Sequence, residues 1–176
     1  MRLFYGLALP DVVRAETARL SKEAAALMPG RYLDPVSHHL TLAFIGEVDE
    51  SRMTDVQNIL TDALPRFPVP RVTLTGTDFF KRPQNGILIV RAECALAPLH
   101  DALCEALIRS NLPVDPKPFA AHITLARHVS IDPQALGSLT PKPLSFSPAQ
   151  AHIFLSTHNE QGGPLYTPIF SAPFAP

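Results

Sequence analysis

The sequence has no excess of basic residues. It contains 15 lysines and arginines against 16 aspartates and glutamates, and charged residues make up only 18% of the chain. A protein that holds long nucleic acid through its phosphate backbone usually carries a clear basic excess. The balance argues against a duplex-binding protein. If the chain acts on RNA, we expect it to grip a terminus or a few nucleotides.

Cysteine and long apolar runs are also scarce. Cys94 and Cys104 form no CxxC pair and have no histidines at zinc spacing, so we expect both to be small buried residues. No segment approaches the roughly 18 apolar residues of a membrane span. The apolar run after Met1 is shorter than that of a signal peptide, so we expect it to form a first strand. We therefore expect a soluble, cytoplasmic protein that is a monomer.

Proline, in contrast, is abundant. The 19 prolines are about twice the usual frequency, and they separate short apolar segments, which favours a fold with many short strands. Residue patterns predict strands at 3–9, 39–45, 71–80, 86–92, 122–126, 151–156 and 166–171, and helices at 12–28, 50–64 and 97–110. Strands and helices in near-equal share predict an α+β fold, with residues 1–176 forming one domain of two lobes.

Two segments of the sequence match each other. Residues 39–44 (HLTLAF) and 122–127 (HITLAR) are identical at four of six positions, and they lie nearly half the chain apart, which suggests an internal duplication. Side chains alternate faces along a strand, so His39 shares a face with Thr41, and His122 shares one with Thr124. If a pseudo-twofold axis relates the two lobes, two imidazoles and two hydroxyls can line one cleft.

This set of side chains suits phosphoryl chemistry. Imidazole titrates near pH 6.5, so one histidine can take a proton from water while the other protonates a leaving oxygen. Threonine hydroxyls can hydrogen-bond the phosphate oxygens. No acidic residue lies within five positions of His122, whereas zinc needs three or four ligands in one place. We therefore expect neither a metal nor another cofactor.

Phe44 and Arg127 hold the same place in the two segments. Strict alternation puts both on the face opposite the histidines, and they would reach the cleft only if each strand ends or bulges there. Arginine can fork onto phosphate or ribose oxygens. Phenylalanine can stack on a base or belong to the core.

Other polar residues are weaker candidates. His38 lies on the strand face opposite His39, so we expect a bystander, and His100 belongs to no constellation. His152 could face the cleft. Lys81 and Arg82 either guide RNA or form a solvated turn.

The two motifs resemble the signature of the 2H phosphoesterases. The closer likeness is to the RNA 2′,3′-cyclic phosphodiesterases, which are also called LigT-like proteins or 2′-5′ RNA ligases. It covers nearly the whole chain and is carried by residues 2–4, 39–48, 119–127 and 155–166. The resemblance implies a two-lobed LigT-like fold, with antiparallel sheets and outer helices related by a pseudo-twofold around a central cleft. It also implies that His39 and His122 are catalytic, and that Thr41, Thr124 and Arg127 bind the substrate, with Phe44 as a further contact.

The resemblance implies metal-independent hydrolysis of RNA 2′,3′-cyclic phosphate ends to a 2′-phosphate, a reaction that could run in reverse as 2′-5′ ligation. One alternative is a phosphodiesterase for a small cyclic nucleotide or a 2′-5′ oligonucleotide, and another is a non-catalytic RNA-binding protein. The natural RNA, the direction in cells and the oligomeric state stay open. For polarity we expect His39 as the acid and His122 as the base, because Arg127 would lower the pKa of His122.

Overall fold

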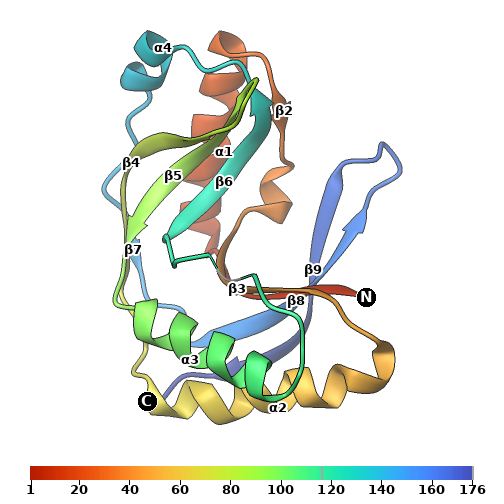
Figure 1. The fold of residues 1–176 in the computed structure, drawn as a ribbon. Coiled ribbons are helices and arrows are strands. Elements are labelled where there is room, and N and C mark those ends of the chain that lie inside the picture. Colours follow the sequence, from red (N-terminus) through yellow and green to blue (C-terminus); the bar gives the residue numbers. More distant parts are fainter. Residues whose placement is uncertain (116, 176) are drawn as a thin grey trace.

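Figure 1 shows the computed structural model, which describes residues 1–115 and 117–175. The strands are β1 (Arg2–Ala8), β2 (Arg31–Tyr32), β3 (His39–Glu47), β4 (Val72–Lys81), β5 (Gly86–Glu93), β6 (His122–Val129), β7 (Ser145–Phe146), β8 (Gln150–His158) and β9 (Pro164–Pro173). The helices are α1 (Asp11–Leu27), α2 (Met53–Ala63), α3 (Ala97–Arg109) and α4 (Pro133–Ser138), with three short 3₁₀ turns. All seven expected strands and all three expected helices are present.

The sequence patterns missed three short elements. The strands β2 and β7 have two residues each, which is too short for any alternation to be visible. The six-residue helix α4 starts with Pro133 in its first turn, and the Asp132 carboxylate caps it by accepting from the backbone nitrogen of Gln134 at 2.9 Å. Six residues give too few turns to show an apolar stripe.

The strands form one sheet in the order β7-β4-β5-β6-β3-β1-β8-β9, with β2 attached to β6. The sheet narrows between β6 and β3, where Leu40 and Ile123 are the one matched pair of residues. Along this path four strands lie on each side of the junction, β2 adds a fifth beside β6, and each set is antiparallel. The expected antiparallel α+β fold is therefore confirmed, and its two half-sheets meet at the strands that carry the two motifs.

The junction between β3 and β6 carries a local twofold axis. Residues that face each other in an antiparallel pair are related by such an axis. Leu40 and Ile123 hold equivalent places in the two motifs and are direct partners. The axis that exchanges them therefore also exchanges His39 with His122, and Thr41 with Thr124.

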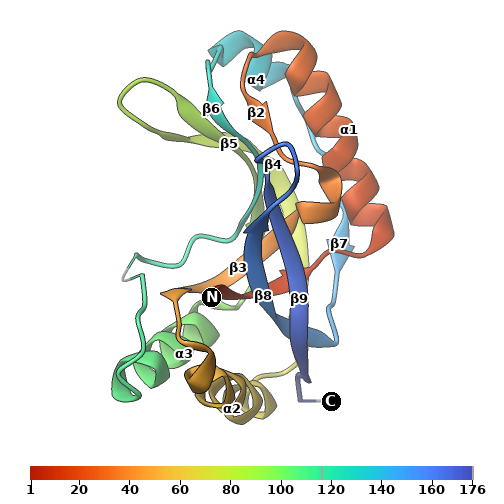
Figure 2. The same ribbon diagram turned by 90° about the vertical axis from the view of Figure 1, so that its right-hand side faces the viewer.

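The helices divide between the two half-sheets. In Figures 1 and 2, α1 and α4 lie against the half with β4, β5 and β6, while α2 and α3 lie against the other half. Helix α1 follows β1 but packs beside β6, and α3 follows β5 but packs beside α2 and β3. Each of these helices thus follows a strand of one half and covers the other, so the two halves share their helices.

The apolar faces of the two motif strands anchor this arrangement. Leu40 and Leu42 of β3 and Ile123 and Leu125 of β6 are at most 1% exposed. Burying each such side chain contributes about 1.5–3 kcal/mol. These residues alternate with the histidines and threonines along each strand. Their burial therefore keeps the histidine and threonine side chains on the opposite face of the sheet.

Cys94 and Cys104 are unpaired and half-buried against the core, so they are less enclosed than expected. Within the described residues, no helix is long and apolar enough to cross a membrane.

Candidate active site

A cavity of about 560 Å³, the central cleft, lies where the two half-sheets meet. All six residues singled out from the sequence line it: His39, Thr41, Phe44, His122, Thr124 and Arg127. Sequence reasoning missed several other lining side chains, which come from elements distant in the chain: Arg2, Phe80, His100, Phe119 and Tyr166. Phe80 and His100 lie in no motif, and Arg2, Phe119 and Tyr166 lie in segments that carry the family resemblance but received no role from it. The fold brings all five to the cleft.

Both cleft histidines are held in the same way. The Nδ1 atom of His39 donates a hydrogen bond to the carbonyl of Ser37 at 2.7 Å, and Nδ1 of His122 donates to the carbonyl of Ala120 at 2.6 Å. In each case the acceptor lies two residues before the histidine. A carbonyl can only accept, so Nδ1 carries the hydrogen and Nε2 is the atom that exchanges a proton. The Nε2 atom of His39 lies 3.2 Å from the Thr41 hydroxyl.

Burial lowers the pKa of both imidazoles. His39 lies among aromatic rings, with Phe4 at 4.6 Å and Tyr166 at 4.8 Å between ring centroids, and burial lowers its pKa to about 4. The rings of His122 and Phe80 are nearly perpendicular, with centroids 4.8 Å apart, and burial lowers the pKa of His122 below the usual 6.5. The hydrogen bonds to the carbonyls oppose these shifts.

Arg127 lowers the pKa of both histidines, after burial, and so does not single out His122. The argument that made His122 the base and His39 the acid therefore applies to both histidines.

Matched bulges explain how Phe44 and Arg127 reach the cleft. Thr41 and Ala43 pair with consecutive residues of β1, so Leu42 is an extra residue. Thr124 and Ala126 pair with consecutive residues of β5, so Leu125 is extra in the same way. An extra residue resets the alternation of side chains beyond it. Burial patterns along β3 and β6 show the reset, because two buried residues follow each other at 42–43 and 125–126.

The carbonyl of each bulged residue has a partner outside the strand ladder. On α3, His100 Nδ1 donates to the carbonyl of Leu42 at 2.7 Å, and its ring lies 5.4 Å from that of Phe119. The backbone nitrogen of Leu33 donates to the carbonyl of Leu125 at 2.9 Å. This role of His100 has no signature in the sequence, because its partner is a backbone atom 58 positions away.

The cleft is basic although the chain is not. Five cationic residues line it, and Asp115 is the one lining carboxylate among the described residues; the cations are Arg2, Lys81, Arg82, Lys117 and Arg127. Asp115 pairs with Lys117 at 2.8 Å. Near-neutral net charge therefore conceals a local excess of positive charge. Lys81 and Arg82 line the cleft and are also exposed, at the end of β4 and in the turn after it.

The remaining candidate histidines lie outside the cleft lining. His38 is buried against α1, where its Nδ1 is 2.8 Å from the Thr17 hydroxyl, and burial lowers its pKa to about 4. His152 faces Phe154 with ring centroids 5.8 Å apart. Across residues 1–115 and 117–175 there is no group of three or more His, Cys, Asp or Glu side chains that could hold a metal ion.

Comparison with known proteins identifies the family. The family model described as the 2′-5′ RNA ligase superfamily matches residues 9–159. The chain belongs to this superfamily. An RNA 2′,3′-cyclic phosphodiesterase of Thermus thermophilus is 31% identical over 182 residues, covering 95% of this chain and 87% of the relative. These findings confirm the resemblance expected from the two motifs.

Solved structures extend the likeness to the fold. A Thermus thermophilus crystal structure superposes with a TM-score of 0.83 at 27% identity, covering 99% of this chain and 98% of the other. Escherichia coli LigT complexed with 3′-AMP superposes with a TM-score of 0.72 at 25% identity, with the same coverage.

The geometry of the cleft in this member of the 2′-5′ RNA ligase superfamily suits proton transfer by two histidines. Two imidazoles related by a local twofold axis share one cavity, and each keeps Nε2 available for proton transfer. Two hydroxyls and a guanidinium stand beside them as hydrogen-bond donors. One imidazole could take a proton from an attacking group while the other gives a proton to a leaving group.

Proposed function

We propose that this protein hydrolyses the 2′,3′-cyclic phosphate at RNA ends to a 2′-phosphate, by acid–base catalysis with His39 and His122. The observation that carries the proposal is the pair of identical His–Thr sets related by the twofold axis at Leu40 and Ile123 and lining one cleft. The name of the Thermus thermophilus relative points to the same reaction.

The reaction balances with the side chains of the cleft. The neutral Nε2 of one histidine accepts a proton from water as the water oxygen bonds to phosphorus. The bond from phosphorus to the ribose 3′ oxygen breaks, and the protonated Nε2 of the other histidine gives its proton to that oxygen. Thr41, Thr124 and Arg127 donate hydrogen bonds to the phosphate oxygens as negative charge develops there. Phe44 contacts the terminal nucleoside.

The same site can also open the cyclic phosphate with a nucleophile other than water. A 5′-hydroxyl of a second RNA in place of water would attack the cyclic phosphate and give a 2′-5′ linkage. The two histidines then keep their roles. Water, at about 55 M, competes with a 5′-hydroxyl that is present at a far lower concentration. We therefore propose that hydrolysis is the main reaction.

The mechanism needs no metal, because the imidazoles move the protons and the hydroxyls and guanidinium meet the charge. The first experiment incubates the purified protein with EDTA and RNA ending in a 2′,3′-cyclic phosphate. We expect turnover to persist and the product to carry a 2′-phosphate, as identified by chromatography against both isomers. Loss of turnover with EDTA that zinc or manganese restores would show that the mechanism is wrong.

The same assay tests the two histidines. His39→Ala and His122→Ala should each lower kcat by about 10²–10⁴-fold, while His152→Ala, a matched change outside the cleft lining, should not. A substrate that releases p-nitrophenolate no longer needs an acid. It should rescue only one of the two variants, and the rescued one identifies the acid. Rescue of both or of neither would contradict a division into one acid and one base.

A further inference from the structure

A second cavity of about 380 Å³ adjoins the central cleft at the turn between β4 and β5, and we call it the hairpin pocket. The turn supplies Arg82, Pro83, Gln84 and Asn85, and Arg127 and His128 come from β6. Arg82, Ile87 and Arg127 line both cavities. Because the two cavities share a wall, one extended ligand can contact both at once.

The backbone of β6 is shaped at this wall. His128 adopts a left-handed conformation with φ 52°, which is unusual for a residue other than glycine. Gly86 pairs with Val129 and Leu88 with Ala126, so two residues of β6 face the single residue Ile87 of β5. This second bulge directs Arg127 and His128 toward the pocket. His128 is also tied to the turn, since the Asn85 amide nitrogen donates to its Nδ1 at 3.4 Å.

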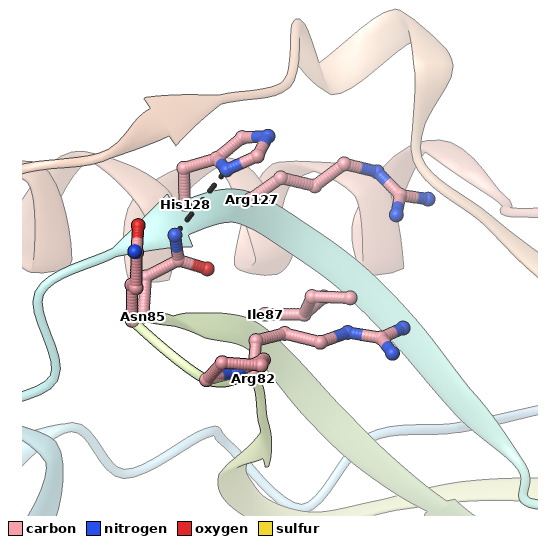
Figure 3. A pocket seen from close by; sticks show the side chains of 7 residues that line it. Arg82, Asn85, Ile87, Arg127 and His128 are labelled. Carbon is pink, nitrogen blue, oxygen red and sulfur yellow. Dashed lines mark hydrogen bonds between the residues drawn. The ribbon is translucent and has the colours of Figure 1, made fainter.

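Two guanidinium groups dominate the charge of the pocket. Figure 3 shows the side chains of Arg82, from the turn after β4, and Arg127, from β6, extending the same way, with Ile87 between them. In the part of the chain that the structure describes, no carboxylate forms a salt bridge with either one. Most of the arginines that do form salt bridges are on helices, and their partners lie three or four residues away in the sequence. Side-by-side cations repel each other, and a shared anion would relieve the repulsion.

We propose that the hairpin pocket holds the internucleotide phosphate on the 5′ side of the terminal nucleoside. The inference rests on the proposed function, because it assumes a 2′,3′-cyclic phosphate between the two histidines. A cyclic end has no 3′ neighbour, so the RNA can leave the central cleft only through the 5′ oxygen of its last nucleoside. The next phosphate of the RNA is therefore the one attached to that 5′ oxygen.

The chemistry of the pocket fits a phosphodiester. Arginine forks onto phosphate oxygens with two parallel hydrogen bonds, and Arg82 is exposed on the turn, where it can reach a passing strand. Ile87 and Pro83 supply an apolar surface for a ribose. The substrate class that follows is an RNA strand of two or more nucleotides, preferred over a free nucleoside 2′,3′-cyclic phosphate.

The test combines three substrates with two variants. The substrates are a nucleoside 2′,3′-cyclic phosphate, a dinucleotide with the same 3′ nucleoside, and that dinucleotide with a neutral methylphosphonate linkage. For the wild type we expect kcat/KM for the dinucleotide to exceed that for either other substrate by about tenfold or more, the effect of a hydrogen bond to a charged group. Arg82→Gln should reduce both ratios toward 1. Arg66→Gln, an exposed arginine that lines neither cavity, should keep the wild-type ratios.

Two results would overturn the subsite. One is equal kcat/KM for the phosphodiester and methylphosphonate dinucleotides in the wild type, and the other is unchanged ratios in Arg82→Gln. Turnover of the nucleoside 2′,3′-cyclic phosphate by the wild type tests the proposed function independently of the subsite. If that turnover is absent, fluorescence anisotropy with labelled dinucleotides ending in a 3′-phosphate gives the same comparison as dissociation constants. Equal affinities for the two linkages would again overturn the subsite.

Discussion

At the residue scale, the two cleft histidines combine a fixed tautomer with lowered pKa values. Their Nδ1 hydrogens are committed to carbonyls, and burial disfavours the charged imidazole in both. A pair in which one ring must be neutral and the other charged gives a bell-shaped dependence of kcat/KM on pH. Because both pKa values of the free protein lie below 6.5, we expect its optimum on the acid side of neutrality.

The profile of kcat should lie at higher pH than that of kcat/KM. A bound phosphate is negatively charged, so it raises both histidine pKa values in the complex. Arg127→Gln removes a positive charge that lowers both pKa values and should move the kcat/KM optimum upward. Initial rates between about pH 4 and 9 test this. A flat profile between about pH 5 and 8 would contradict the paired mechanism.

At the element scale, the matched bulges in β3 and β6 decide which residues the cleft receives. The bulge in β3 depends on His100, whose Nδ1 donates to the carbonyl of Leu42. His100→Leu leaves that buried carbonyl without its partner and should lower the free energy of unfolding by about 1–3 kcal/mol. It should also raise KM, because Phe44 lies two residues beyond the bulge. His100→Asn, which can place an amide donor near the Nδ1 position, should recover part of both losses.

Urea denaturation and initial rates measure the two effects of His100. Equal destabilisation by leucine and asparagine would show that the packing of the ring, and not its hydrogen bond, supports the bulge. Unchanged KM in both variants would show that the bulge in β3 does not affect substrate binding.

At the scale of the whole molecule, buried histidines should make the fold sensitive to acid. His38 and His39 have pKa values of about 4 in the folded protein, against about 6.5 when unfolded. Between these values the unfolded chain binds more protons than the folded one, so stability rises with pH in this window and is lost as pH falls through it. Each such histidine contributes up to about 1.4 kcal/mol per pH unit.

His38→Asn removes one of these titrating groups, so the slope of unfolding free energy against pH between about 4 and 6.5 should decrease. Carboxylates with lowered pKa values, such as Glu16, add their own loss of stability at lower pH. Urea midpoints at several pH values measure the slope. A slope that is unchanged in His38→Asn would show that His38 is charged or solvated in the folded protein.

The sequence by itself determined the main elements and four lining residues of the cleft, the two histidines and the two threonines of the repeated motif. Strand periodicity and the repeated His-x-Thr pattern are local signals, and side-chain alternation alone placed each histidine and its threonine on one face. The short elements β2, β7 and α4 were missed because two to six residues show no period.

Only the tertiary structure decided the rest. Net charge summed over the chain could not show that cations gather at the cleft, because Arg2, Arg82 and Lys117 are far apart in sequence. Alternation left Phe44 and Arg127 on the wrong face unless each strand bulged, and the bulges depend on pairing with β1 and β5. The pKa values of the histidines follow from burial among rings of distant elements. Such effects depend on distances in space, which a linear pattern does not contain.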